Sequence, residues 1–350
     1  MPTMEPSALA DLVLLTRKKL KKLKFVQAAQ RYRRYTLVKD LVKPSRTIVC
    51  DGGYEYEFPI MLTHGDQAKM VGLFEKDSLS ISDVMTMASV PLRFTNTNWF
   101  YDVKEQAMNA GPERLVDTVK NRRLQAMMSN IDMVERGGWG RPAPSDNKTI
   151  WGVPHWVVES ATQGFNGQNP PGWSDLAGVD TDAAANANWR NYTGTYAEFT
   201  KDDLIQVMAE AAEYTNFESP TGADHPDLND GNSSKIFTTF PVRRNISLIG
   251  EAQNQNLGRD VDSMGGKVRF QGNEIHVVPA LEDATVRVVQ DPIYMLNMGT
   301  WNFITQKGGM MREGRPIQLT DRHDTYANHV DGSINLMCTD RRRNTVLYRV

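Results

Sequence analysis

The spacing of apolar and polar residues divides the chain into stretches with a helical period and stretches with a strand period. From Glu5 to about Tyr35, apolar residues recur every three or four positions with lysines and arginines between them, which predicts one amphipathic basic helix. Between Arg46 and Tyr101 the period changes to two, in two alternating stretches separated by a polar tip rich in Gly, Asp and Ser. This pattern predicts an extended β-hairpin.

Two prolines limit where this hairpin can lie. Pro59 and Pro91 fall inside the alternating stretches, and proline cannot donate a hydrogen bond to a neighbouring strand, so neither strand should be central in a sheet. A two-stranded ribbon is only marginally stable by itself in water. We therefore expect the hairpin to rest on another surface, such as that of a neighbouring subunit.

The strongest helical pattern begins at Pro112, a residue type that suits the first helical position. We expect this helix to end at Arg136, because Gly137 and Gly138 supply a C-cap. At 1.5 Å per residue it would be roughly 37 Å long. Its apolar stripe consists of Leu115, Val116, Val119, Leu124, Met127, Met128, Ile131 and Val134.

The rest of the chain mixes loops, strands and one further helix. Residues 139–189 are irregular, and Thr200 with Asp203 forms a capping box that predicts a helix start. The segments "KIFTTFPV" and "EIHVVPALE" are predicted to be strands separated by a glycine-rich turn at 264–266, and 291–350 is again strand-like. The chain is thus predicted to be an α+β protein. Its 350 residues favour two subdomains.

Charge is distributed unevenly along the sequence. Residues 17–43 hold eleven Lys or Arg against one Asp, a net of +10, whereas the whole chain carries −2, so the remainder carries −12. Such asymmetry indicates a polyanion, a membrane surface or an acidic partner protein, although a solvated helix face would give the same pattern. The cations concerned are Arg17, Lys18, Lys19, Lys21, Lys22, Lys24, Arg31, Arg33 and Arg34.

The apolar runs, the N-terminal charges and the cysteines indicate where in the cell the protein folds. The apolar runs are too short to span a bilayer. The charges near the N-terminus follow the apolar stretch "SALADLVLL" instead of preceding it, so we expect no signal peptide. Cys50 and Cys338 are far apart and have no metal-site spacing, which favours folding in a reducing cytosol.

The sequence contains no strong catalytic pattern. His323 and His329 are the one close histidine pair, and Asp321 and Asp324 lie nearby, but no third firm metal ligand is visible. The Gly-Gly-Lys of "SMGGKVRF" lacks the spacing of a phosphate-binding loop, and no Gly-x-Ser-x-Gly is present. We therefore predict a protein that is not an enzyme, with no metal and no cofactor.

The order of these parts resembles the major capsid protein of tailed bacteriophages, which has the Hong Kong 97 fold. Three stretches are similar to that family: "NWFYDVKEQAMNAGPERLVDTVKNRRLQAMMSNIDMVERGGWG" to its hairpin exit and spine helix, "GVPHWVVESATQGFNGQNPPGWSDLAGVD" to the entry of its A domain, and "YMLNMGTWNFITQKGGMMREG" to its closing strands. The resemblance covers residues 25–350.

The resemblance implies a division of the chain. Residues 1–45 would be an N-terminal arm, 46–105 an extended hairpin called the E-loop, and 106–150 a P domain that contains the spine helix. Residues 151–285 would form the α/β A domain, 286–340 further P-domain strands, and 341–350 the closing strand of the A domain.

The resemblance also implies function. The chain would assemble into hexamers and pentamers of an icosahedral head, in the host cytoplasm, and remain in the virion. Partners would be a scaffolding protein, a portal, a possible decoration protein and DNA bound without sequence specificity, with no membrane. The nine cations above would contact scaffold or DNA in the interior. The E-loop would contact the neighbouring subunit through His64, Asp66, Lys69, Phe74 and Lys76.

Two other classes stay open. A cellular nanocompartment shell of the same fold would enclose protein cargo instead of DNA. An unrelated nucleic-acid-binding or metal-dependent enzyme would use the basic helix or the segment "DRHDTYANHV".

Overall fold

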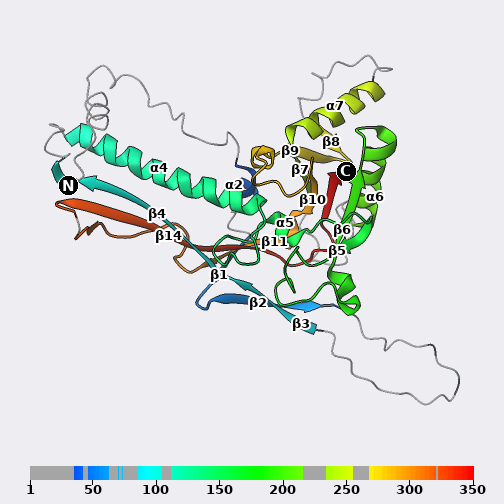
Figure 1. Cartoon of the computed structure of the whole chain (residues 1–350), viewed down its shortest axis with the longest axis horizontal. Coiled ribbons are helices and arrows are strands. Elements are labelled where there is room, and N and C mark those ends of the chain that lie inside the picture. The colour runs from blue at the N-terminus through cyan, green and yellow to red at the C-terminus, as the bar shows by residue number, and fades with distance from the viewer. Residues whose placement is uncertain are drawn as a thin grey trace. The chain divides into compact units, whose positions relative to one another are not determined.

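The computed structural model describes residues 35–41, 46–62, 70, 73, 85–104, 112–215, 234–254, 268–320 and 322–350 (Figure 1). The chain divides into two compact units. The described part of the smaller unit lies within Thr95–Asp132 and Met311–Gly332. The larger unit comprises Arg34–Phe94, Met133–Met310 and Ser333–Val350. The basic helix expected between Glu5 and Tyr35 and the turn at 264–266 lie outside the described residues.

The larger unit is built on a seven-stranded mixed sheet with the order β5-β6-β15-β10-β7-β9-β8. The pairs β6–β15 and β7–β9 are parallel, and the other neighbouring pairs are antiparallel. The strands are β5 (Gly164–Gly167), β6 (Asn191–Tyr196), β7 (Ser234–Thr238), β8 (Arg269–Phe270), β9 (Asn273–Val277), β10 (Ile293–Asn297) and β15 (Thr345–Arg349).

Alternation along the strands gives this sheet two buried faces. On one face, Ile293 and Met295 of β10 pack with residues of α6 (Gln206–Tyr214) and α7 (Phe240–Asn254). On the other face, Tyr294 and Phe237 contact the indole of Trp139, with ring centroids 6.0 and 5.2 Å apart. The apolar run Ile-Tyr-Met-Leu of β10 therefore reflects burial on both sides.

Shorter helical turns connect these strands. They are α5 (Val153–Trp156), η3 (Ala184–Trp189), the π-helical turn η4 (Lys201–Ile205), η8 (Pro279–Glu282) and η9 (Met298–Thr300). The predicted cap at Thr200 is confirmed, since its hydroxyl accepts a hydrogen bond from the Asp203 amide at 3.3 Å. The Asp203 carboxylate accepts from the amides of Ala197 and Glu198 instead of returning to Thr200.

A second sheet has strands in both units. In the larger unit, β1 (Thr47–Cys50) runs parallel to β11 (Trp301–Gln306), which pairs with the end of β14 (Thr325–Cys338). In the smaller unit, the start of β14 pairs with β4 (Arg93–Asp102), β12 (Arg312–Glu313) and β13 (Ile317–Gln318). The smaller core holds Trp99, Ala126 and Val330.

The predicted hairpin is confirmed but shorter than expected. Strands β2 (Glu55–Met61) and β3 (Met85–Pro91) are antiparallel, from the pair Glu55–Pro91 to the pair Met61–Met85. The strand expected to run on to Asp102 ends its pairing with β2 at Pro91, and the residues that follow form a separate strand. The Leu92 amide closes the hairpin on the Tyr54 carbonyl at 2.8 Å, and β4 pairs with β14 instead.

The predicted end of the long helix was wrong. Helix α4 (Pro112–Trp139) continues through both glycines that were expected to cap it. A Cβ on Gly137 would lie 2.9 Å from Ile150 Cγ1, and one on Gly138 would overlap the side chain of Leu37. These glycines therefore permit close packing of the helix instead of ending it.

Two further differences concern strands. The segment "KIFTTFPV" is strand only to Thr238, and helix α7 follows, with Pro241 in its first turn, where proline is compatible with a helix. Strand β10 lies in the segment 286–340 expected to hold P-domain strands, yet it pairs with β7 and β15 of the seven-stranded sheet.

Candidate assembly surfaces

The side chains predicted to contact partners lie outside the described residues. The residues in question are Arg17, Lys18, Lys19, Lys21, Lys22, Lys24, Arg31, Arg33 and Arg34 in the N-terminal segment, and His64, Asp66, Lys69, Phe74 and Lys76 at the hairpin tip. Their roles stay predictions. The structure does describe residues 35–41, which follow the first of these segments, and residues 55–61 and 85–91, which flank the second.

The backbone at Thr36–Val38 is held by one buried carboxylate. Glu135 of α4 is fully buried. Its Oε1 accepts from the Thr36 amide at 2.9 Å, the Thr36 hydroxyl at 3.0 Å, the Leu37 amide at 3.0 Å and the Trp139 indole at 3.0 Å, and Oε2 accepts from the Val38 amide at 3.0 Å. We call this arrangement the Glu135 clasp. It satisfies the free amides at the start of helix α2 (Thr36–Leu41).

The hairpin has one face turned toward its own chain. Phe58, Ile60, Ala88 and Val90 are buried. The Ser89 amide donates to the Ala177 carbonyl at 2.9 Å, and Asn188 Nδ2 donates to the Leu62 carbonyl at 3.0 Å. The described part of the ribbon thus rests on another surface, as expected, and that surface is the segment 176–190 of the same chain and not a neighbouring subunit.

The opposite face of the hairpin is exposed, and it is apolar at the end away from Glu55. Met61, Met85 and Met87 are 62%, 58% and 56% exposed. Met61 lies opposite Met85, and Met87 lies opposite Pro59, so these side chains share one face at the end of the ribbon away from Glu55. We call Met61, Met85 and Met87 the methionine face. Unbranched thioether side chains adapt to irregular partner surfaces, so this face is suited to bind another protein.

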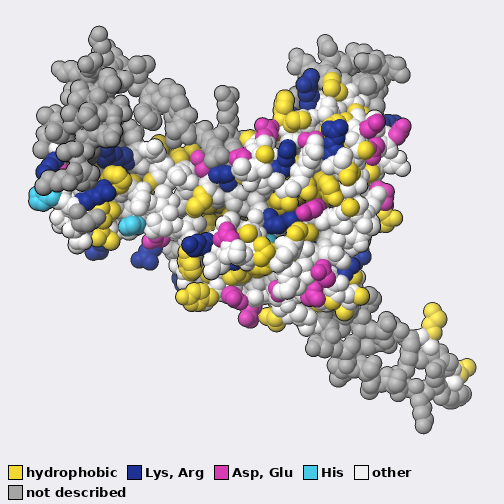
Figure 2. Space-filling model, in the orientation of Figure 1, with side chains coloured by type: hydrophobic (Ala, Val, Ile, Leu, Met, Phe, Trp, Pro, Cys, Tyr) yellow, Lys and Arg dark blue, Asp and Glu magenta, His cyan; other side chains and the backbone are white. Residues whose placement is uncertain are grey.

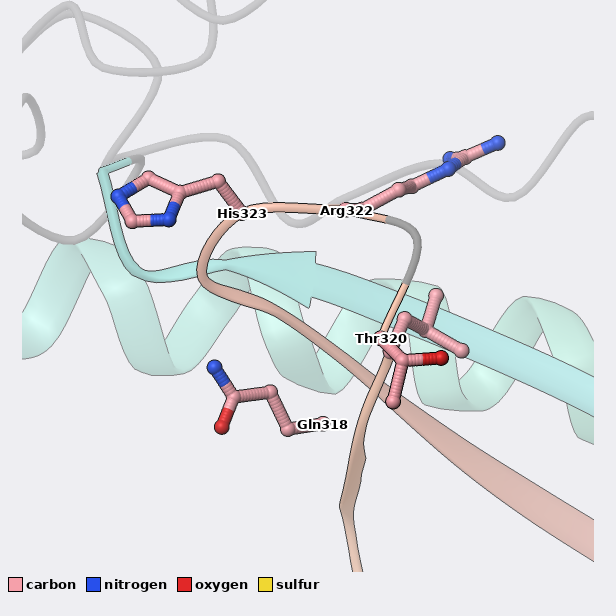
Figure 3. A pocket seen from close by; sticks show the side chains of 5 residues that line it. Gln318, Thr320, Arg322 and His323 are labelled. Atoms are coloured by element: carbon pink, nitrogen blue, oxygen red, sulfur yellow. The ribbon is translucent and has the colours of Figure 1, made fainter.

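A hollow with a mostly polar lining lies in the smaller unit. The loop between β13 and β14 borders an open hollow lined by Gln318, Leu319, Thr320, Arg322 and His323. Figure 3 shows the side chains of Arg322 and His323 pointing away from each other, so they do not converge on one ligand.

Lys and Arg side chains are interspersed with Asp and Glu over the face of the larger unit shown in Figure 2.

The histidine pair considered as metal ligands does not share a partner. His323 precedes β14, and its Nε2 lies 3.3 Å from Asp324 Oδ2. His329 Nδ1 lies 3.4 Å from Asn96 Nδ2, which also donates to Asp331 at 2.7 Å. Within the part of the chain that the structure describes, no group of three His, Cys, Asp or Glu is placed to hold a metal ion.

A buried arginine joins α5, β5 and β6. Arg341 is fully buried, and its Nε donates to the Trp156 carbonyl at 2.6 Å. Its Nη2 lies within hydrogen-bond distance of the carbonyls of Gly167 and Gln168 and of Asn191 Oδ1, at 3.0–3.1 Å. Burial lowers the pKa of this guanidinium. These oxygens carry partial negative charge toward the cation, so a structural role explains the residue.

His155 in α5 is fully buried beside this network. Burial, followed by the charges of Arg141, Arg341 and Arg93, holds the pKa of His155 well below its usual 6.5. Arg141 is itself paired with Glu159, with Nη1 2.8 Å from Oε1. The folded protein therefore keeps this imidazole neutral at pH values where the unfolded chain protonates it.

We expect this histidine to make the larger unit sensitive to acid. Below pH 6.5 the unfolded state binds a proton that the folded state does not, so stability is complete above 6.5 and falls as the pH is lowered toward 5. The loss should approach about 1.4 kcal/mol per pH unit. Urea unfolding at pH 7, 6 and 5 measures it, and His155→Phe should show a flatter profile. Parallel profiles for the two proteins would contradict the expectation.

Sequence patterns could have revealed the methionine face but not the Glu135 clasp. Met85 and Met87 alternate with Thr86 and Ala88, so the strand period already placed both methionines on one face. Glu135 gave no such signal, because its partners at Thr36–Val38 are almost one hundred positions earlier in the chain.

No helix among the described residues is long and apolar enough to cross a membrane. No protein-family model and no curated protein matches the sequence.

Solved structures with little sequence similarity do match the chain. A protein of the cyanophage A-1(L) capsid asymmetric unit is 12% identical, with a TM-score of 0.62 over 96% of this chain and 98% of that one. A protein of the capsid of the myovirus phage XM1 is 9% identical, with a TM-score of 0.54 over 95% and 98%. A protein of the cyanophage P-SCSP1u capsid is 12% identical, with a TM-score of 0.50 over 95% and 94%. The chain therefore has the Hong Kong 97 fold of these capsid proteins.

Proposed function

We propose that this chain is the major capsid protein of a tailed bacteriophage, and that copies of it assemble into hexamers and pentamers of an icosahedral head around double-stranded DNA. The observation that carries the proposal is the end-to-end match of the fold to phage capsid subunits, over 96% of this chain and 98% of the cyanophage A-1(L) protein. Its role is then structural and not enzymatic, its location is the virion, and it assembles in the host cytoplasm.

The proposal explains why the chain combines a rigid core with an apolar face on a ribbon. A shell subunit works through contact area, and an interface of standard size buries about 1,600 Å². A closed shell repeats each interface many times, so moderate single contacts give large collective stability. Closed symmetry also stops growth when the geometry is satisfied. The methionine face supplies apolar area outside the core for such a contact.

In this proposal the parts of the chain keep the roles that the resemblance implies, with one change. Residues 1–45 act as the arm, 46–105 as the E-loop, 106–150 with later strands as the P domain, and 151–285 with the closing strand 341–350 as the A domain. We move β10 (Ile293–Asn297) from the P domain to the A domain, because it pairs with β7 and β15.

Size and appearance test the proposal directly. The expressed chain should elute in the void volume or as capsomers on size-exclusion chromatography, and negative-stain micrographs should show closed shells or rings. A monodisperse monomer at high concentration would contradict assembly. A nanocompartment shell of the same fold is the alternative, and nuclease protection separates the two: a phage head protects DNA, whereas a nanocompartment holds protein and protects none.

The basic N-terminal segment gives a prediction about the interior. We expect replacement of Lys18, Lys19, Lys21 and Lys22 by Glu to impair assembly with an acidic scaffolding protein or packaging of DNA, because it turns four attractive charges into repulsive ones. The yield of filled particles in an infected host measures the effect. Wild-type yields would show that these charges do not face a polyanion.

Portal and decoration proteins are further partners under this proposal.

A further inference from the structure

Three aromatic side chains beneath the hairpin form a closed triangle. Trp151 and His155 have ring centroids 4.8 Å apart, His155 and Trp173 are 4.9 Å apart, and Trp151 and Trp173 are 6.1 Å apart. Trp151 precedes α5, His155 lies in α5, and Trp173 belongs to the loop that follows β5. The three rings thus join two segments of the larger unit.

The polar atoms of this triangle are buried without partners. Eleven buried side-chain nitrogen or oxygen atoms among the described residues make no hydrogen bond within the chain. Four of the eleven belong to these three rings: Nδ1 and Nε2 of His155, and Nε1 of Trp151 and of Trp173. More than nine-tenths of buried polar groups in native proteins are paired, with protein or with ordered water. Such a concentration of unpaired atoms therefore indicates a ligand.

The numbers of hydrogen-bond donors and acceptors among these four atoms indicate which kind of ligand fits. Each indole can only donate, whereas a neutral imidazole has one donor nitrogen and one acceptor nitrogen. Arg93, Arg141 and Arg341 are the charged groups that act on His155, and all three oppose its protonation. An anion such as chloride could accept from the indoles but would leave the acceptor nitrogen of His155 unpaired. A ligand that both accepts and donates satisfies both kinds of atom.

We propose that an ordered water molecule occupies the triangle, accepts hydrogen bonds from the Trp151 and Trp173 indoles and donates one to the imidazole of His155. A buried water typically makes about three hydrogen bonds to groups that are otherwise unsatisfied, and here it would pair three of the four atoms: the two indole nitrogens and the acceptor nitrogen of His155. The inference does not depend on the function proposed above.

The water site lies at the base of the hairpin. Asn335 Oδ1 accepts from the Trp151 amide at 2.9 Å, and Asn335 Nδ2 donates to the Pro91 carbonyl at 2.6 Å. The loop that carries Trp173 also provides the Ala177 carbonyl that holds Ser89 of β3. The water therefore links α5 to the loop on which the hairpin rests, so it helps to fix the hairpin base to the sheet.

A density map of the full chain at about 2 Å resolution tests the proposal. We expect a solvent peak 2.7–3.2 Å from one His155 nitrogen and from both indole nitrogens. An empty triangle would overturn the proposal. Crystals grown in bromide in place of chloride should show no anomalous peak there, and such a peak would overturn it in favour of an anion.

A substitution gives an independent check. Trp173→Phe keeps an aromatic ring but removes one donor, so the solvent peak should weaken to less than half of its wild-type height or disappear. Trp189→Phe is the matched control, because its buried indole already donates to the Thr339 carbonyl at 3.4 Å, and it should leave the peak unchanged. An unchanged peak in Trp173→Phe would contradict the proposal.

Discussion

Replacement of Glu135 by alanine is expected to destabilise the larger unit by about 3–5 kcal/mol, one of the largest effects available from a single substitution. The change would leave the amides of Thr36, Leu37 and Val38 and the indole of Trp139 without the acceptor that each has now. Hydrogen bonds to a charged group contribute roughly 1.5–3 kcal/mol each, and unpaired buried donors incur their full desolvation cost.

Two further variants locate the source of this effect. Glu135→Gln keeps one oxygen but replaces the other acceptor by an NH₂ group, so we expect an intermediate loss of about 2 kcal/mol. Glu213→Ala removes an exposed carboxylate from α6 of the same unit and should change stability by less than about 0.5 kcal/mol. Urea unfolding followed by tryptophan fluorescence measures all three. A loss below about 1 kcal/mol for Glu135→Ala would show that the clasp is not needed for folding.

The clasp also predicts an effect on the segment that precedes it. Glu135 holds the backbone at Thr36–Val38, so it fixes the point at which the basic N-terminal segment leaves the larger unit. Limited trypsin digestion should therefore cleave Glu135→Gln near Lys39 faster than the wild-type protein, under conditions in which both remain folded. Equal cleavage rates would separate the stability effect from any role in positioning the segment.

If the chain forms shells as proposed, charges on the methionine face are expected to abolish particle formation while leaving the subunit folded. Met61 and Met87 are more than half exposed, so the double substitution Met61→Glu and Met87→Glu removes little core packing. In an assembled shell the same positions would bury two unpaired carboxylates in each copy, at a cost of several kcal/mol per contact. Because the contact repeats over the whole shell, we expect a loss of particles of at least a hundredfold.

Particle yield by sucrose-gradient sedimentation and folding by circular dichroism measure the two halves of this prediction. Glu57→Gln, on the exposed face of the same strand but nearer its base, is the matched control and should assemble normally. Normal particles from the double variant would mean that the methionine face is not an assembly contact. A subunit that fails to fold would mean that the face is part of the core.

Local patterns predicted the hairpin and the long helix but could not predict where each ends. The alternation that gives β3 continues without a break from Arg93 to Asp102, so the sequence offers no sign that the partner changes. The change depends on β14, more than two hundred positions later. Similarly, Gly137 and Gly138 have the usual sequence of a helix end, and only their contacts with Ile150 and Leu37 show why the helix passes through them.

Of the candidate sites, one could be predicted from local sequence and the others could not. Parity along a strand is a local property, so the methionine face could be predicted from residue spacing. The Glu135 clasp and the ring triangle are assembled from segments far apart in the chain, and neither Glu135 nor His155 differs in sequence from an ordinary surface residue. Sequence alone correctly indicated the fold through the order of its parts, but not the buried polar groups that hold these parts together.

Under the proposed function, the methionine face would also make the unassembled subunit vulnerable to oxidants. A thioether converted to its sulfoxide changes from an apolar group to a polar one. Peroxide added before assembly would thus reach Met61, Met85 and Met87, whereas the same dose added to finished shells would meet side chains already covered by a neighbour. The extent of methionine oxidation before assembly would then determine what fraction of the subunits can enter a shell.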